Sequence, residues 1–155
     1  MKIHQFVLLF IIFITILSCS EKNQEIPEPV TFDTLFDSKY NLHKILIFAI
    51  HRKIEIEGYL SIKGTTSLHT KTLNLAFSEK QDNSGRSISA NIRIGNGPNQ
   101  VEMLPKFYSK DELKIHTNKN EIIGADVRVK LTGKRFCPKD NTSCYIIVEE
   151  IEKAE

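Results

Sequence analysis

The chain lacks an excess of charge of either sign. Its 155 residues include 21 basic and 19 acidic residues, which gives a formal net charge of +2. A nearly balanced chain provides no long-range electric field that would draw in polyanions. The composition therefore gives no support to nucleic-acid binding, although the calculated pI is slightly basic.

The chain also lacks the residue arrangements typical of catalytic, metal and cofactor sites. It has no G-x-S-x-G motif and no H-x-H or H-E-x-x-H motif. The glycines around Asn96 have neither the lysine nor the spacing of a phosphate-binding loop. We therefore expect no catalytic residue, no bound metal and no cofactor. The carboxylates and histidines are expected on solvated or structural positions: Glu55, Glu57, Asp126, His43, His51, His69 and His116.

A long apolar segment is missing as well. The only apolar run near the N-terminus extends from Phe6 to Leu17 and follows Lys2. A helix needs about 20 apolar residues to cross a bilayer, so this run is too short for a permanent transmembrane helix. A basic start followed by a short apolar run predicts a signal peptide.

The end of this run is Ile16-Leu17-Ser18-Cys19. It resembles the lipobox of bacterial lipoproteins. The resemblance implies that residues 1–18 are removed and that Cys19 becomes the acylated first residue, carrying fatty acids such as palmitate. It implies a lipid-anchored protein of the bacterial cell envelope, and Ser20 resembles the residue found there in outer-membrane lipoproteins. The alternatives are an ordinary secretory leader and an uncleaved anchor.

The three cysteines are consistent with lipidation of the first. An odd number of cysteines leaves one thiol unpaired in an exported protein. If Cys19 carries lipid, Cys137 and Cys144 remain as a pair that an oxidising compartment allows to form a disulfide. We expect a structural role for that bond rather than a redox-active or metal-binding one.

Three segments follow from the composition of the chain. Residues 1–18 are the predicted signal peptide, and residues 19–30, with two prolines, are a predicted flexible tether. Residues 31–155 are long enough for one domain with its own core. Within it, residues 41–51 are predicted to form either a helix that begins at Asn41 or a buried strand, because their apolar run has no clear period.

Alternation of apolar and polar residues predicts five strands in the domain. Pro98 is favourable at the first turn of a helix, which we expect to end before Pro105. Five strands with a short helix between the third and fourth strands are the order of the OB fold. The predicted strands span residues 54–62, 72–78, 87–94, 126–132 and 145–151, and the predicted helix spans 98–104.

Two of these segments carry a further resemblance. Glu55-Ile56-Glu57-Gly58-Tyr59-Leu60 and the run from Val127 to Lys134 resemble the first and fourth strands of small bacterial OB-fold proteins. The resemblance implies a mainly β, five-stranded OB-fold-like Greek-key barrel. A small β-sandwich with the same strand count is the alternative architecture.

The expected function is that of a non-enzymatic binding or interaction domain, held at a lipid bilayer through Cys19. Its ligand would be an envelope component, either a glycan or a protein. Single-stranded nucleic-acid binding of the OB type and an enzyme are the alternatives, in that order. The residues predicted to form the ligand-binding face are Tyr59, Arg93 and Phe136.

Overall fold

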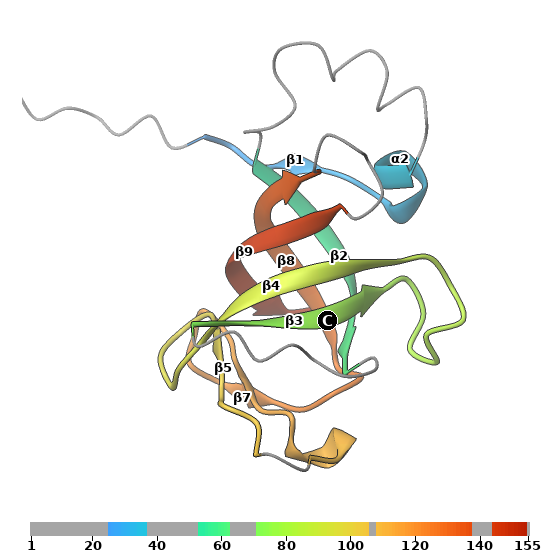
Figure 1. Cartoon of the computed structure of the whole chain (residues 1–155). Helices are drawn as coiled ribbons and strands as arrows, with labels where there is room; N and C mark the ends of the chain where they lie inside the picture. The colour runs from blue at the N-terminus through green and yellow to red at the C-terminus, as the bar shows by residue number, and fades with distance from the viewer. Residues whose placement is uncertain (1–24, 37–52, 63–70, 106–107, 138–143, 155) are drawn as a thin grey trace, which may run out of the picture.

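Five strands of seven to nine residues form a closed barrel in the part of the chain that the structure describes (Figure 1). This computed structural model describes residues 25–36, 53–62, 71–105, 108–137 and 144–154. The barrel strands are β2 (Lys53–Ser61), β3 (Thr72–Ser78), β4 (Ser87–Ile94), β8 (Arg128–Phe136) and β9 (Tyr145–Lys153).

The barrel strands form because their sequences alternate, which directs every second side chain inward. The inward residues are almost fully buried and form one core. Phe77 is its largest fully buried side chain, and its ring is 5.4 Å from that of Phe32, which precedes the barrel in sequence. The five strands predicted from the alternation are confirmed.

The barrel closes in the order β2-β3-β4-β9-β8 and back to β2. Each of these pairings is antiparallel except β4 with β9, which is parallel. The order of the five strands is therefore 1-2-3-5-4-1. The fold is an OB-fold-like barrel, as predicted, and not a sandwich of two separate sheets.

Strand β2 can pair on both edges because it bends at Gly58. Residues Lys53 to Tyr59 pair with β8, whereas Tyr59 to Ser61 pair with β3 on the other edge. A Cβ atom at position 58 would lie 2.5 Å from the carbonyl oxygen of Ser78. Only glycine allows the close approach of β3 to β2 at this bend.

The N-terminal segment covers part of the β2 edge that β3 does not reach. Strand β1 (Glu28–Pro29) pairs in parallel with Ile54 and Glu55, and helix α2 (Phe32–Phe36) follows it. The amide of Val30 donates a hydrogen bond of 2.8 Å to the carbonyl oxygen of Glu55. Residues 28–30, at the end of the predicted tether, thus lie against the barrel, because an open strand edge provides them with hydrogen-bond partners.

The helix predicted over residues 98–104 is also wrong. Asn99 has a φ of 61°, in the left-handed region, which interrupts a right-handed helix. Gln100 and Val101 instead form strand β5, which pairs with the end of β4. The described residues between β4 and β8 further include a 3₁₀ turn, η1 (Lys110–Glu112), and strands β6 (Ile115–His116) and β7 (Ile122–Ile123). The only helical piece among them is thus η1.

The structure does not test the alternatives for residues 41–51, since they lie outside the described residues.

The bend in β2 gives a test of the fold. Gly58→Ala should lower the free energy of unfolding by about 2–3 kcal/mol, because the new methyl group collides with backbone that cannot move away cheaply. Urea unfolding of the purified protein measures this change. Gly124→Ala is the matched control: its Cβ would find only the Leu113 carbonyl oxygen, at 3.8 Å. Equal stability of the two variants would contradict the assigned role of Gly58.

Candidate functional site

One side of the barrel carries almost no charge. The strand register places its outward side chains in two rows that cross β3, β4, β9 and β8. We call this surface the neutral wall. The first row is Ala76, Ser89, Tyr145 and Phe136, and the second is Asn74, Asn91, Ile147 and Lys134.

Amide and hydroxyl groups lie at the centre of the neutral wall. The side-chain nitrogen of Asn91 donates to Asn74 Oδ1 at 2.7 Å and lies 3.2 Å from Thr72 Oγ1. Among the described residues, no hydrogen bond reaches Asn91 Oδ1 or the side-chain nitrogen of Asn74. One acceptor oxygen and one NH2 group of these half-buried side chains thus have no hydrogen-bond partner among the described residues.

An aromatic pair borders these amides. The rings of Phe136 and Tyr145 are 5.1 Å apart and tilted by 45°. Phe136 is 36% exposed, and the neighbouring Ile147 is 42% exposed. Together they give the wall an apolar patch beside its hydrogen-bonding groups.

The few cations of this side lie at its border. Arg93 is exposed at the end of β4, and among the described residues it has no ion-pair partner. Lys134 ends the second row and lies opposite Lys53 in the register of β8 with β2. The neutral wall thus has one cation at each of two borders and no charge between them.

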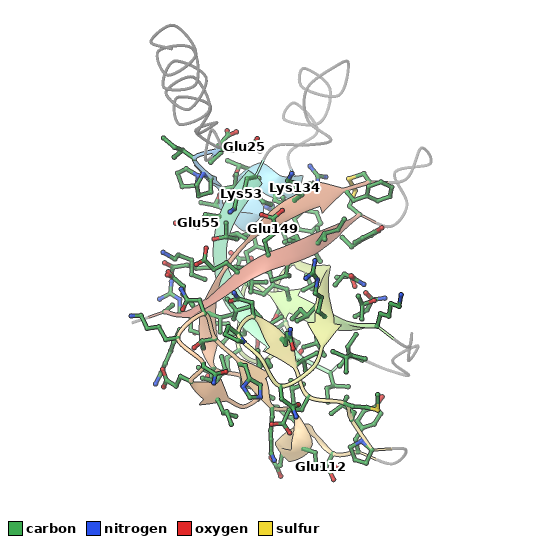
Figure 2. The ribbon with its side chains drawn as sticks, turned by 90° about the vertical axis from the view of Figure 1, so that its left-hand side faces the viewer. Glu25, Lys53, Glu55, Glu112, Lys134 and Glu149 are labelled. Atoms are coloured by element: carbon green, nitrogen blue, oxygen red, sulfur yellow. A yellow bond between two sulfur atoms is a disulfide. The ribbon has the colours of Figure 1, made fainter. Side chains whose placement is uncertain are left out.

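The outward residues of β2, β8 and the end of β9 form a very different surface, which we call the charged wall. Three of its ion pairs join neighbouring strands: Glu57 with Arg128, Glu55 with Lys130, and Lys130 with Glu152. A fourth, Lys53 with Glu149, reaches from β2 across β8 to β9. Figure 2 shows Glu25, Lys53, Glu55, Lys134 and Glu149 gathered near the end of the barrel where the N-terminal segment joins it. These pairs contain four carboxylates and three cations, because Lys130 serves two glutamates, so most of the charge on this wall is compensated within it.

Lys130 and Glu152 form the closest ion pair of the charged wall, at 2.7 Å. The hydrogen bond from Lys130 lowers the pKa of the Glu152 carboxyl, and a second bond from the Asn118 amide lowers it further. The same bond to Glu152 raises the pKa of the Lys130 ammonium. The carboxylates predicted to be solvated, Glu55 and Glu57, are thus ion-paired strand residues.

Tyr59 lies away from the neutral wall's two rows. It lines a groove of about 480 Å³ between β2 and the N-terminal segment, together with Gly58, Phe32 and Arg128. The groove occupies the stretch of β2 edge between its pairing with β1 and its pairing with β3. It is a second, smaller candidate site.

The structure therefore divides the predicted ligand-binding face. Phe136 belongs to the neutral wall and Arg93 to its border, whereas Tyr59 lies in the groove beside β1. Sequence reasoning missed Tyr145, Ile147 and Asn91. Their outward positions follow from the alternation of their strands, but their adjacency depends on the parallel pairing of β4 with β9.

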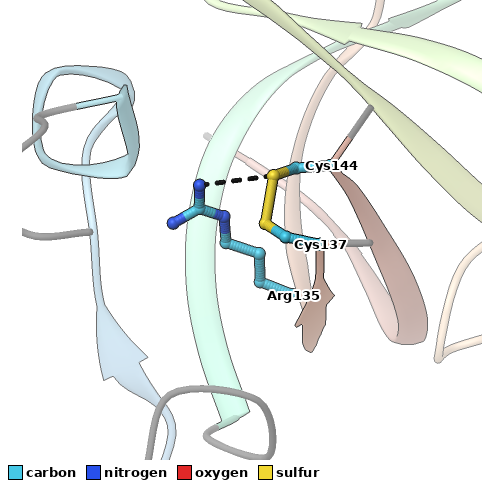
Figure 3. Close-up of a disulfide and its surroundings, with 3 residues drawn as sticks. All are labelled: Arg135, Cys137 and Cys144. Atoms are coloured by element: carbon cyan, nitrogen blue, oxygen red, sulfur yellow. Dashed lines mark hydrogen bonds between the residues drawn. A yellow bond between two sulfur atoms is a disulfide. The ribbon is translucent and has the colours of Figure 1, made fainter. Parts of the chain in front are cut away.

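The predicted disulfide between Cys137 and Cys144 is present in the structure. It directly follows the last pair of the β8–β9 hairpin, Phe136 with Tyr145, and its Cα atoms are 4.1 Å apart. The guanidinium of Arg135 lies 3.6 Å from Cys144 Sγ (Figure 3). The bond therefore holds together the hairpin end that carries the aromatic pair. Cys19 lies outside the described residues.

His116, on β6, is the only histidine among the described residues and is 5% exposed. His43, His51 and His69 lie outside them. Its ring nitrogens lie 3.2 Å from Glu102 Oε1 and 3.2 Å from Asn120 Oδ1. These contacts join β6 to the residues that follow β5 and to the turn before β7. Both nitrogens are thus used within the fold.

Two further findings concern only the described residues. They include no group of three or more histidine, cysteine, aspartate or glutamate side chains placed to hold a metal ion. They also include no helix with the length and apolar character needed to cross a membrane.

Comparison of the chain with protein-family models, with curated proteins and with solved structures finds no match. The function is therefore inferred from the side chains of the neutral wall and the charged wall.

The Lys130–Glu152 pair predicts how stability depends on pH. A carboxyl with a lowered pKa stabilises the fold above its ordinary pKa of 4.5, and this contribution is lost as the pH falls through the lowered value. Glu152→Gln should therefore cost about 0.5–1 kcal/mol at neutral pH and almost nothing at about pH 2. Urea unfolding at both pH values measures the difference.

Glu79→Gln is the control, because Glu79 has no ion-pair partner among the described residues. A cost of Glu152→Gln that stays constant between the two pH values would show that the pair does not stabilise the fold through its charges.

Proposed function

We propose that the chain is an exported, lipid-anchored protein of the bacterial envelope whose barrel binds an uncharged glycan on the neutral wall. The observation that carries the proposal is the neutral wall itself. It combines hydrogen-bonding groups of Asn74 and Asn91 with the exposed side chains of Phe136 and Ile147 and the half-buried ring of Tyr145.

The chemistry of this surface matches that of a sugar polymer. Sugar hydroxyl groups both donate and accept hydrogen bonds, as the side-chain amides of asparagine do. The C–H faces of a pyranose ring are apolar and pack against aromatic rings, which bring a large contact area with little polarity. A neutral ligand needs no opposing charge, so the balanced net charge is no obstacle.

The position of the wall on the fold also supports the proposal. OB barrels bind oligonucleotides or oligosaccharides on their second and third strands and on the loop between the fourth and fifth. Here β3 and β4 carry the amides, and the aromatic pair lies at the base of the loop closed by Cys137 and Cys144. A fold of this kind hosts many different ligands, so the side chains of the wall decide which one fits.

The lipid anchor rests on the sequence from Ile16 to Cys19. Five residues separate Cys19 from Glu25, so an acylated Cys19 would hold the barrel within about 20 Å of the bilayer. Glu25 lies beside Lys53, at the charged wall. The attachment would thus leave the amides of β3 and β4 free to meet a glycan of the envelope.

Single-stranded nucleic acid is the second candidate ligand. Phe136 and Tyr145 would provide a stacking platform, and Arg93 and Lys134 would be the cations beside it. Such binding needs a continuous basic groove and weakens strongly with salt. Two border cations are few for that role, which is why the glycan is preferred.

A glycan array tests the ligand. The labelled lipoprotein, held in detergent micelles, should bind uncharged oligosaccharides with an affinity that barely changes between about 50 and 500 mM salt. Tyr145→Ala and Asn91→Ala should each weaken that binding about tenfold, a loss of about 1.4 kcal/mol.

Glu57→Gln, on the charged wall, is the matched control and should bind as the unchanged protein does. Binding that is restricted to oligonucleotides and falls steeply with salt would favour the second candidate. Loss of binding in the control variant, or none in Tyr145→Ala, would remove the neutral wall from the proposal.

Metabolic labelling with an alkyne fatty acid tests the anchor. Cys19→Ala should carry no label and should appear in the soluble fraction, because a thioether to lipid cannot form on alanine. Ser20→Ala keeps the acceptor cysteine and should remain labelled in the membrane fraction. A Cys19→Ala protein that stays at the membrane would disprove the lipid anchor.

A further inference from the structure

The disulfide that follows the last pair of the β8–β9 hairpin has two chemically different sulfur atoms. Arg135 places its guanidinium nitrogen 3.6 Å from the sulfur of Cys144 (Figure 3). Cys144 is also partly buried against the hydrophobic core, whereas Cys137 is not among the residues that pack there. The two sulfur atoms of one bond therefore have different surroundings.

This difference decides how the bond would break. In thiol–disulfide exchange a thiolate attacks one sulfur atom, and the other leaves as a thiolate. The sulfur whose thiolate is better stabilised leaves faster. The partial contact of Cys144 with the apolar core disfavours its thiolate. Arginine is charged at all relevant pH values, and a cation this close favours the thiolate over the thiol. The direction of exchange therefore depends on the charge of Arg135 outweighing the apolar contact.

We propose that Cys137–Cys144 is a directional site for thiol–disulfide exchange with a thiol or dithiol of the cell envelope. The partner's thiolate attacks Cys137 Sγ and forms a new S–S bond with it. The bond between Cys137 and Cys144 breaks, and its electron pair leaves on Cys144, where Arg135 stabilises the thiolate.

The mixed disulfide on Cys137 then has two fates, both balanced in atoms and electrons. A second thiolate of the partner attacks the partner's own sulfur, which leaves the partner oxidised and Cys137 reduced. Alternatively, the Cys144 thiolate attacks Cys137 Sγ, releases the partner's thiolate and restores the original bond. No other co-reactant is needed.

The site also bears on the neutral wall, although the proposal does not depend on a glycan ligand. The Phe136–Tyr145 pair is the hairpin pair directly next to the disulfide. Opening the bond removes the covalent link that holds these two strand ends together, so the aromatic pair loses its closest restraint. Exchange at Cys137 would thus alter the apolar patch of the wall.

Glutathione is the probe for the direction of attack. The full-length protein is treated with excess glutathione, quenched in acid, alkylated and mapped by mass spectrometry. We expect glutathione mainly on Cys137 and alkylation mainly on Cys144. In Arg135→Gln this preference should fall, whereas Arg128→Gln, which removes another arginine of β8, should leave it unchanged.

Single-cysteine variants provide a second measurement that does not depend on the intact bond. At pH 7 iodoacetamide should alkylate Cys144 in Cys137→Ser faster than Cys137 in Cys144→Ser. The alkylation rate should rise about threefold for each unit by which Arg135 lowers the thiol pKa. A lower pKa makes each thiolate less nucleophilic, but it increases the fraction of thiolate by more. Arg135→Gln in the Cys137→Ser background should abolish this advantage.

Equal labelling of the two cysteines by glutathione would overturn the proposal, and so would a preference that survives Arg135→Gln. A failure of glycan binding on the array would leave this result unaffected, because the exchange experiment uses no glycan.

Discussion

Strand β2 has to pair along both edges for this barrel to exist, and the missing side chain at Gly58 is what allows it. The strand follows β8 as far as Tyr59 and then approaches β3 so closely that a Cβ at position 58 would meet the Ser78 carbonyl oxygen. Every other feature depends on this closure. It turns one face of each strand into a shared core and the other into a wall, and it leaves a short open edge on which β1 can pair.

The alternation of the strands could be read from the sequence because a half-buried strand repeats every two residues. The same rule indicated the disulfide's place at a hairpin, whereas Phe136 was expected in the connecting loop and is instead the last residue of β8. The segment from Pro98 to Leu104 could not be read in this way. Its local signals favour a helix, but Asn99 adopts a left-handed conformation and Gln100 pairs with β4 and β6, contacts that only the folded barrel provides.

The candidate site was only partly predictable for a similar reason. Tyr59 and Arg93 were recognised as outward residues, yet a linear sequence does not show which outward residues become neighbours. Asn91 meets Ile147, and Ser89 meets Tyr145, only because β4 and β9 pair in parallel across more than fifty residues of chain. The same pairing creates the contrast between a neutral wall and a wall whose charges are already paired, which is the main argument for an uncharged ligand.

The attachment of β1 also has a mechanical consequence. Tension applied to the residues before Glu25 would pass into the barrel through the parallel contact of Glu28 and Pro29 with Ile54 and Glu55. A pull along the strand axis loads these hydrogen bonds in shear, so they share the force instead of opening one by one. The load then enters β2, which β8 and β3 hold on opposite edges. The barrel is therefore pulled at a strand that is held on both edges, and the amides of β3 and β4 lie outside the direct path of the force.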